Sequence, residues 1–201
     1  MLKQTLKHTT IGQRRQKGYT LIELGIAIAI LAVLTVAGLS GVQSIMNSSK
    51  VSEQVKVFGR LQTRITANYL GGSTATATQS EVANLGGWDG NRVNAGVVTS
   101  AFGTTETLVT NAAVIGTLPM NRGFTYTIQN VPQAACPELA QGLAPMAYAL
   151  WINTAITVPT SWTTAADSLV KAADAQVWTP AGIAKACATG NPLTFNVGIK
   201  P

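Results

Sequence analysis

The sequence predicts an α+β protein in which one long N-terminal helix packs on an antiparallel β-sheet. Three observations lead to this fold class. Residues 24–49 contain no charged side chain, and this stretch exceeds the ~20 residues that span a bilayer as a helix. Apolar residues then recur every three or four positions as far as Tyr69. Residues 73–201 are rich in turn-forming residues and short alternating segments, which is typical of a globular α+β head.

Basic charge is concentrated at the N-terminus. The chain has a net charge of +6 and a pI of about 9.6, but residues 1–18 carry most of this excess and hold no acid. The remainder is nearly neutral and shows no basic stripe, so we expect no nucleic-acid site. The charge instead predicts a basic leader on the cytoplasmic side of a membrane. Its basic residues are Lys3, Lys7, Arg14, Arg15 and Lys17.

The helical pattern predicts one helix from about residue 20 to residue 69, roughly 75 Å long. Residues 19–45 form its transmembrane and assembly part, in which small residues at four-residue spacing would let helices approach closely. Residues 46–72 form an amphipathic part, ended by Gly71 and Gly72. The apolar face of that part comprises Val51, Val55, Phe58, Leu61, Ile65 and Tyr69.

The head of residues 73–201 is predicted from its local patterns. Alternation and β-branched residues predict strands at 107–115, 123–131, 146–153 and 193–199. Short helices are expected at 137–143, 164–175 and 183–188, the second because Thr164 and Asp167 have the spacing of a helix cap. Residues 86–91 read Gly-Gly-Trp-Asp-Gly-Asn, which indicates a loop.

Glu23 is the one ionisable residue between Lys17 and Lys50. A carboxylate near the start of a membrane-length helix is costly, so the first hypothesis is that Glu23 has a function and a partner. The alternative is an acid that reaches the membrane surface with its side chain and has no partner.

Gly18 ends the basic leader, Tyr19 begins the apolar helix, and Glu23 is the fifth residue after this junction. This arrangement resembles the class III signal of type IV prepilins and pseudopilins. The resemblance implies a pilin fold and cleavage between Gly18 and Tyr19 by a membrane prepilin peptidase. It also implies methylation of the Tyr19 amine and a pairing of Glu23 with the N-terminal amine of a neighbouring subunit.

Within this family the chain looks most like the type IVb pilins of adhesion and conjugative pili. Its mature chain would begin with Tyr19 rather than phenylalanine, and residues 1–118 contain no proline. Cleavage would leave the large product 19–201. The resemblance implies a structural major pilin that polymerises with itself through the pilus assembly machinery. The precursor would lie in the inner membrane with its leader cytoplasmic and its head periplasmic, and the product in an extracellular filament.

The chain has two cysteines, Cys136 and Cys187, and neither belongs to a CxxC pair. If this part is exported, we expect one disulfide that closes a loop of about 50 residues and adds ~3–4 kcal/mol of stability. A zinc site would need more ligands.

Enzymatic function, cofactors and metals are not expected. The one histidine, His8, lies in the leader, so the head has no histidine-based nucleophilic centre. Glu106, Glu138, Asp167 and Asp174 form no recognisable pair and are expected on a solvated surface. Two other functions remain open: a minor pilin or type II secretion pseudopilin, and a membrane-anchored module that binds a ligand through Trp88, Trp151, Trp162 and Trp178.

Overall fold

The computed structural model describes residues 19–111, 114–115, 117–155, 169–173 and 178–201. The chain divides into two compact units, residues 1–43 and Ser44–Pro201, and each is described by itself. Helix α1 (Leu21–Tyr69) supplies the described helix of the first unit and the first element of the second. The long N-terminal helix predicted from the sequence is thereby confirmed.

Helix α1 begins directly after Thr20. The hydroxyl of Thr20 accepts a hydrogen bond of 3.3 Å from the Glu23 amide, and its carbonyl accepts one of 3.1 Å from the Leu24 amide. A threonine in this position satisfies an amide that has no partner within the helix. The helix ends where predicted: the Gly72 amide donates to the Tyr69 carbonyl, and Gly71 has a φ of +71° that disfavours other residues.

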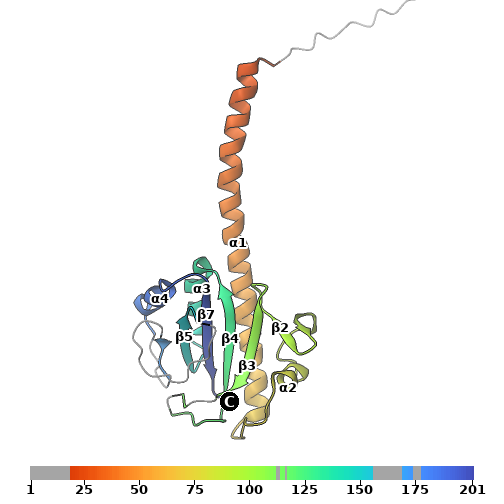
Figure 1. Cartoon of the computed structure of the whole chain (residues 1–201), viewed down its shortest axis with the longest axis vertical. Coiled ribbons are helices and arrows are strands. Elements are labelled where there is room, and N and C mark those ends of the chain that lie inside the picture. Colours follow the sequence, from red (N-terminus) through yellow and green to blue (C-terminus); the bar gives the residue numbers. More distant parts are fainter. Residues whose placement is uncertain (1–18, 112–113, 116, 156–168, 174–177) are drawn as a thin grey trace, which may run out of the picture. The chain divides into compact units, whose positions relative to one another are not determined.

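The second unit is built on an antiparallel sheet (Figure 1). Within the described residues it has seven strands in the order β1-β2-β3-β4-β7-β5-β6. The last strand of the chain, β7, lies between β4 and β5, so the C-terminal segment occupies the middle of the sheet. The strands are β1 (Val93–Asn94), β2 (Val97–Thr99), β3 (Thr105–Thr110), β4 (Phe124–Val131), β5 (Ala149–Asn153), β6 (Leu169–Lys171) and β7 (Leu193–Ile199).

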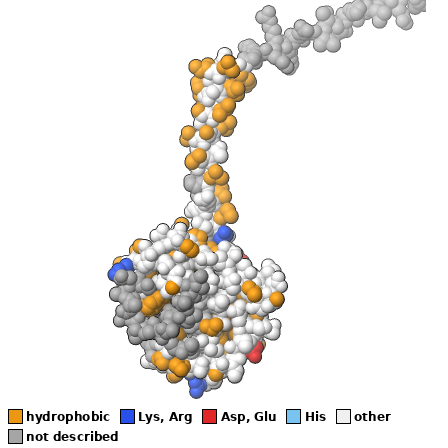
Figure 2. Space-filling model, in the orientation of Figure 1, with side chains coloured by type: hydrophobic (Ala, Val, Ile, Leu, Met, Phe, Trp, Pro, Cys, Tyr) orange, Lys and Arg blue, Asp and Glu red, His pale blue; other side chains and the backbone are white. Residues whose placement is uncertain are grey.

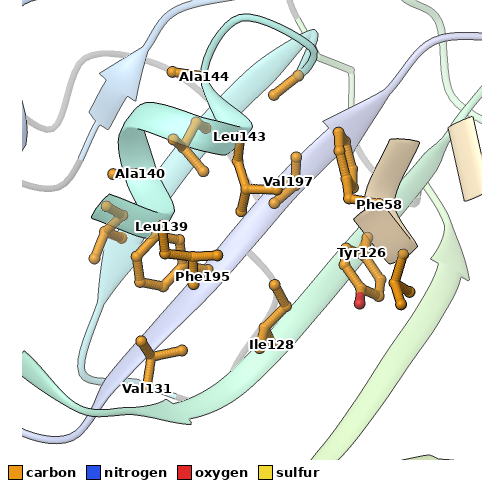
Figure 3. Close-up of a cluster of buried hydrophobic side chains, with 14 of the residues drawn as sticks. Phe58, Tyr126, Ile128, Val131, Leu139, Ala140, Leu143, Ala144, Phe195 and Val197 are labelled. Atoms are coloured by element: carbon orange, nitrogen blue, oxygen red, sulfur yellow. The ribbon is translucent and has the colours of Figure 1, made fainter. Parts of the chain in front are cut away.

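The main core lies on the face of the sheet that packs against α1 and α3 (Cys136–Leu143). Figure 3 shows Phe58 of α1 beside Tyr126 of β4, and the two rings stack with centroids 5.9 Å apart. Leu139 and Leu143 of α3 lie over β7 in the same view. The apolar face predicted for α1 enters this core through Val51, Phe58, Leu61 and Ile65, and Val55 and Tyr69 pack at its edge.

The opposite face of the sheet is also buried, although its central residues are polar. Thr125 and Thr127 of β4 and Asn196 of β7 are at most 1% exposed, and the Thr127 hydroxyl donates to the Asn196 carboxamide over 2.9 Å. A second, smaller core on this side consists of Ile115, Leu118, Ala149 and Trp151. The sheet is therefore covered on both faces.

Two further short helices frame the head. Helix α2 (Gln79–Asn84) begins at a capping box, in which Thr78 bonds the Glu81 amide and the Glu81 carboxylate bonds the Thr78 amide. Helix α4 (Pro180–Cys187) begins at Thr179, whose hydroxyl accepts from the Gly182 amide. Single 3₁₀ turns, η1 (Gly90–Arg92) and η2 (Gln133–Ala135), precede β1 and α3.

Several predicted elements are confirmed with shifted ends. Strands β3, β4, β5 and β7 and helices α3 and α4 lie where their patterns predicted. The helix predicted at 164–175 is wrong where the structure describes it, because residues 169–171 form strand β6 beside β5; most of the remaining positions lie outside the described residues. Helix α2 and strands β1 and β2 were not predicted, because each is too short to show a helical or strand periodicity in its sequence.

A disulfide joins Cys136 at the start of α3 to Cys187 at the end of α4, with Cα atoms 5.8 Å apart. Both cysteines are buried in the main core. The bond confirms the sequence prediction and ties the segment that leads into the central strand β7 to helix α3.

We predict that replacing Cys136 and Cys187 with serine lowers the free energy of unfolding of a 44–201 fragment by about 4 kcal/mol, because the bridge closes a 51-residue separation in the unfolded chain. Urea denaturation would measure the difference. Alanine at both positions is the control, since it removes the bond without burying two hydroxyl groups. Unchanged stability in both variants would contradict a structural role for the bridge.

Candidate functional site

The first candidate site is the surface of the N-terminal part of α1. Every described residue from 19 to 39 is exposed, including Leu21 at 91% and Val36 at 71%. Figure 2 shows apolar side chains around this stretch of helix. The helix is long and apolar enough to cross a membrane. Such a surface is stable only in contact with lipid or with other protein chains.

Two of the residues singled out from the sequence lie at the start of this helix. Tyr19 precedes it and is 82% exposed. Glu23 lies in the first turn and is exposed. Its negative charge interacts favourably with the positive end of the helix dipole. Among the residues that the structure describes, Glu23 forms no ion pair. Gly18 lies outside the described residues.

A second set of polar residues lies buried inside the head, between α1 and the sheet. Glu106 of β3 is fully buried, and its carboxylate accepts hydrogen bonds from Gln54 of α1 over 2.6 Å and from the Trp88 indole over 2.8 Å. Gln54 also donates to the Tyr126 hydroxyl over 2.6 Å. Arg92 lies 3.7 Å from the Glu106 carboxylate and forms a 2.5 Å ion pair with Glu53 of α1.

This buried cluster joins α1, β3, β4 and the segment before β1. A buried carboxylate is tolerated only with donors and a positive charge nearby, because desolvation otherwise costs several kcal/mol. The Gln54 carboxamide group bonds through both ends, since its nitrogen donates to Glu106 and Tyr126 and its oxygen accepts from the Ala101 amide over 3.0 Å. These hydrogen bonds of Gln54 therefore fix the rotation of α1 about its own axis relative to the sheet.

The prediction that Glu106 is solvated was wrong. In β3, Glu106 and Leu108 both point inward because alternate residues of a strand share a face. Gln54 likewise lies on the apolar stripe, three positions after Val51 and four before Phe58. A polar residue on the apolar stripe of α1 was the signal that could have revealed the cluster, whereas Glu106 lay one residue before the strand predicted at 107–115. Glu138 is exposed as predicted, and Asp167 and Asp174 lie outside the described residues.

The tryptophans that the structure describes do not form an open surface. Trp88 is 3% exposed and Trp151 is 9% exposed, and Trp178 packs against the main core. Trp162 lies outside the described residues. The described indoles thus contribute to packing, which leaves the ligand-binding alternative without structural support at these three positions.

Burial shifts the pKa of Tyr69, Tyr126 and Lys171 in the head. It raises the pKa of Tyr126 well above its usual value, and the neighbouring Glu106 charge adds to the effect. Burial lowers the pKa of Lys171, whose ammonium donates to the carbonyls of Ala144 and Ala147 over 2.9 and 2.7 Å at the end of α3. A cation in this position also interacts favourably with the negative end of the helix dipole.

Known proteins resemble this chain both in the sequence of its N-terminal region and in its fold. A family model described as the prokaryotic N-terminal methylation motif matches residues 13–39. The chain is similar to a fimbrial protein of Neisseria meningitidis serogroup B (strain ATCC BAA-335 / MC58), with 36% identity over 86 residues. That alignment covers 43% of this chain and 43% of the relative's length.

Two solved structures share the fold. The crystal structure of TcpA, a type IV pilin from Vibrio cholerae El Tor, matches with a TM-score of 0.56 at 16% identity, covering 75% of this chain and 98% of that one. A type IV b pilin from Salmonella typhi matches with a TM-score of 0.52 at 19% identity, covering 75% and 99%. The fold is that of type IV pilins, and the methylation motif and the fimbrial relative support the type IV pilin family.

We predict that the free energy of unfolding of the 44–201 fragment falls as the pH rises above 10. The unfolded chain loses the Tyr126 proton near pH 10, whereas the folded chain, with its raised pKa, retains it. Unfolding then releases a proton, which costs about 1.4 kcal/mol of stability per pH unit. Tyr126→Phe is expected to remove this part of the slope in denaturation series between pH 9 and 11.

Tyr69→Phe is the matched control, because Tyr69 is only half-buried and its pKa is raised to a smaller extent by burial and by Glu81. A wild-type slope retained in Tyr126→Phe, or lost equally in Tyr69→Phe, would contradict the assignment to Tyr126.

Proposed function

We propose that this chain is the major structural subunit of a type IVb-like pilus, anchored in the inner membrane and then polymerised into an extracellular filament. The observation that carries the proposal is the exposed apolar helix of residues 19–39, which lies within the methylation motif matched at residues 13–39. The pilin fold of the head and its buried disulfide support the same function. The role is structural rather than catalytic.

Processing would follow from the junction at the start of α1. Prepilin peptidase would cut between Gly18 and Tyr19, and the new Tyr19 amine would be methylated. The exposed position of Tyr19 ahead of the first helical turn supports this step, because a peptidase needs an extended, accessible backbone. Residues 19–201 would then keep the apolar helix as their anchor.

Assembly would place Glu23 of one subunit beside the Tyr19 amine of a neighbour. An ammonium and a carboxylate that leave water together recover much of the free energy that each would lose alone. The pilus assembly machinery of the inner membrane would act on the processed subunit.

The experiment that tests this function is mass spectrometry with N-terminal sequencing of filaments sheared from the cell surface. The proposal expects this chain, beginning at methylated Tyr19, as the predominant component. A trace amount in filaments built from another subunit would favour the minor pilin or pseudopilin alternative. An intact leader on assembled filaments would contradict the proposed processing.

We predict that Gly18→Asp leaves an uncut precursor in the membrane, because the larger charged side chain keeps the peptidase from the scissile bond. Immunoblots of membrane fractions would show the unprocessed length. Gly25→Ala is the matched control: it changes a glycine beyond the junction whose added Cβ has no neighbour within 4 Å in this chain. Its cleavage is expected to be normal.

We also predict that Glu23→Val spares membrane insertion and cleavage but sharply lowers filament yield. Valine suits an apolar helix better than glutamate does, yet each added subunit would bury an unpaired ammonium at a cost of several kcal/mol. Thr35→Val is the control, since it replaces a polar residue of the same helix whose hydroxyl bonds only the Leu31 carbonyl in the described chain. Normal filament yield from Glu23→Val would overturn the proposed role.

A further inference from the structure

Oppositely charged side chains lie at the two ends of the head. At one end, the Ser48 hydroxyl of α1 donates to the Glu138 carboxylate of α3 over 2.7 Å. At the other end, Arg122 donates to the Gly71 carbonyl over 2.9 Å, just beyond the end of α1. Ser48 and Gly71 are separated by roughly 35 Å along a helix that rises 1.5 Å per residue. Glu138 and Arg122 therefore cannot pair within one copy.

The end that carries Arg122 is hollowed into a pocket of about 340 Å³. Arg122 and Lys200 line it and are both exposed. Pro201 lines it too, and the carboxylate of this last residue offsets one of the two positive charges, which leaves the pocket with an excess of positive charge. Figure 2 shows a basic side chain at this end of the head, where α1 terminates in Figure 1. Gly71 and Gly72 form part of the wall, so no side chain fills the space there.

The chemistry of this pocket suits a carboxylate. The Arg122 guanidinium has five N–H donors, of which the Gly71 carbonyl takes one, so a planar anion has donors to meet. The Lys200 ammonium lies 5.3 Å from the centre of the Tyr148 ring, which holds a second positive charge at the site.

Glu138 is the acid of the head that suits this pocket. It is exposed in the first turn of α3. Within the part of the chain that the structure describes, its carboxylate accepts from the neutral Ser48 hydroxyl and can accept further hydrogen bonds. The other described acids of the head are engaged: Glu53 and Asp89 in ion pairs, Glu81 in the cap of α2, and Glu106 in the buried cluster.

We propose that Glu138 of one copy enters the pocket of the next copy and pairs with Arg122 and Lys200. The inference rests on the proposed function, because it requires copies arranged in a filament. A contact between opposite ends of identical subunits does not close on itself in pairs and so extends into an open series. Exposed ion pairs contribute little individually, but they select the register in which two surfaces meet.

The test is charge reversal in the full-length chain, read as the yield of sheared filaments relative to subunit in the membrane. Glu138→Arg and Arg122→Glu are each expected to lower the yield several-fold, because each places like charges together. The combined variant Glu138→Arg/Arg122→Glu is expected to restore much of it. Lys56→Glu is the matched control, since it reverses an exposed charge of α1 between the two ends.

Each outcome distinguishes the two proposals. Filaments formed normally by Glu138→Arg would overturn the head contact and leave the pilus function intact, whereas a wild-type chain that forms no filaments would overturn both. Loss with Arg122→Glu alone, or no rescue by the combined variant, would show that the pocket takes another anion. If a reversal lowers the amount of subunit, Glu138→Gln and Arg122→Gln remove each charge without placing like charges together, and each is expected to lower the filament yield.

Discussion

The structure depends on one constraint: a single helix contains two stretches that require different surroundings. Residues 19–39 expose apolar side chains on every side, and each large one gains roughly 1.5–3 kcal/mol when it leaves water. Residues 51–65 instead bury a narrow stripe against the sheet of their own chain. The first stretch therefore requires lipid or other copies, whereas the second is satisfied within the head. The proposed passage from membrane to filament would need this division, because the head must stay folded while the surroundings of the first stretch change.

Inside the head, polar residues add a directional requirement to the close packing of α1. Leu61 and Ile65 are fully buried in the main core, where side chains pack closely. Gln54 adds hydrogen bonds of fixed geometry, because its carboxamide bonds Glu106, Tyr126 and the Ala101 amide together. A rotation would leave a buried carboxylate short of donors, at a cost of several kcal/mol. The buried cluster thus favours one orientation of α1 relative to the sheet.

The long helix and several strands could be predicted from the sequence, because the patterns that indicate them involve residues close together in the chain. The charge-free run before Lys50, the junction at Gly18 and Glu23, and the alternation in β4 each depend on neighbouring residues. The place of β7 in the middle of the sheet does not, since it depends on pairings with β4 and β5 far away in the chain. Residues 169–171 followed a helix-like pattern but form an edge strand, because pairing with β5 outweighs weak local preference. Glu106 lay one residue before the strand predicted at 107–115, whereas β3 begins at Thr105, so its inward position was missed and the general tendency of acids to be exposed decided the prediction.

The two ionic contacts proposed between copies differ in their physical nature, and this difference assigns them different tasks. A Glu23 carboxylate beside an ammonium in an apolar bundle gains little over separate hydrated ions, but an unmatched charge there is prohibitive. Such a contact excludes wrong arrangements more than it stabilises the right one. The Glu138 carboxylate and the Arg122 guanidinium are exposed to water, so a mismatch costs less and salt weakens the attraction between them. The first contact would therefore decide whether a subunit enters the filament, whereas the second would adjust how neighbouring heads are aligned once it has entered.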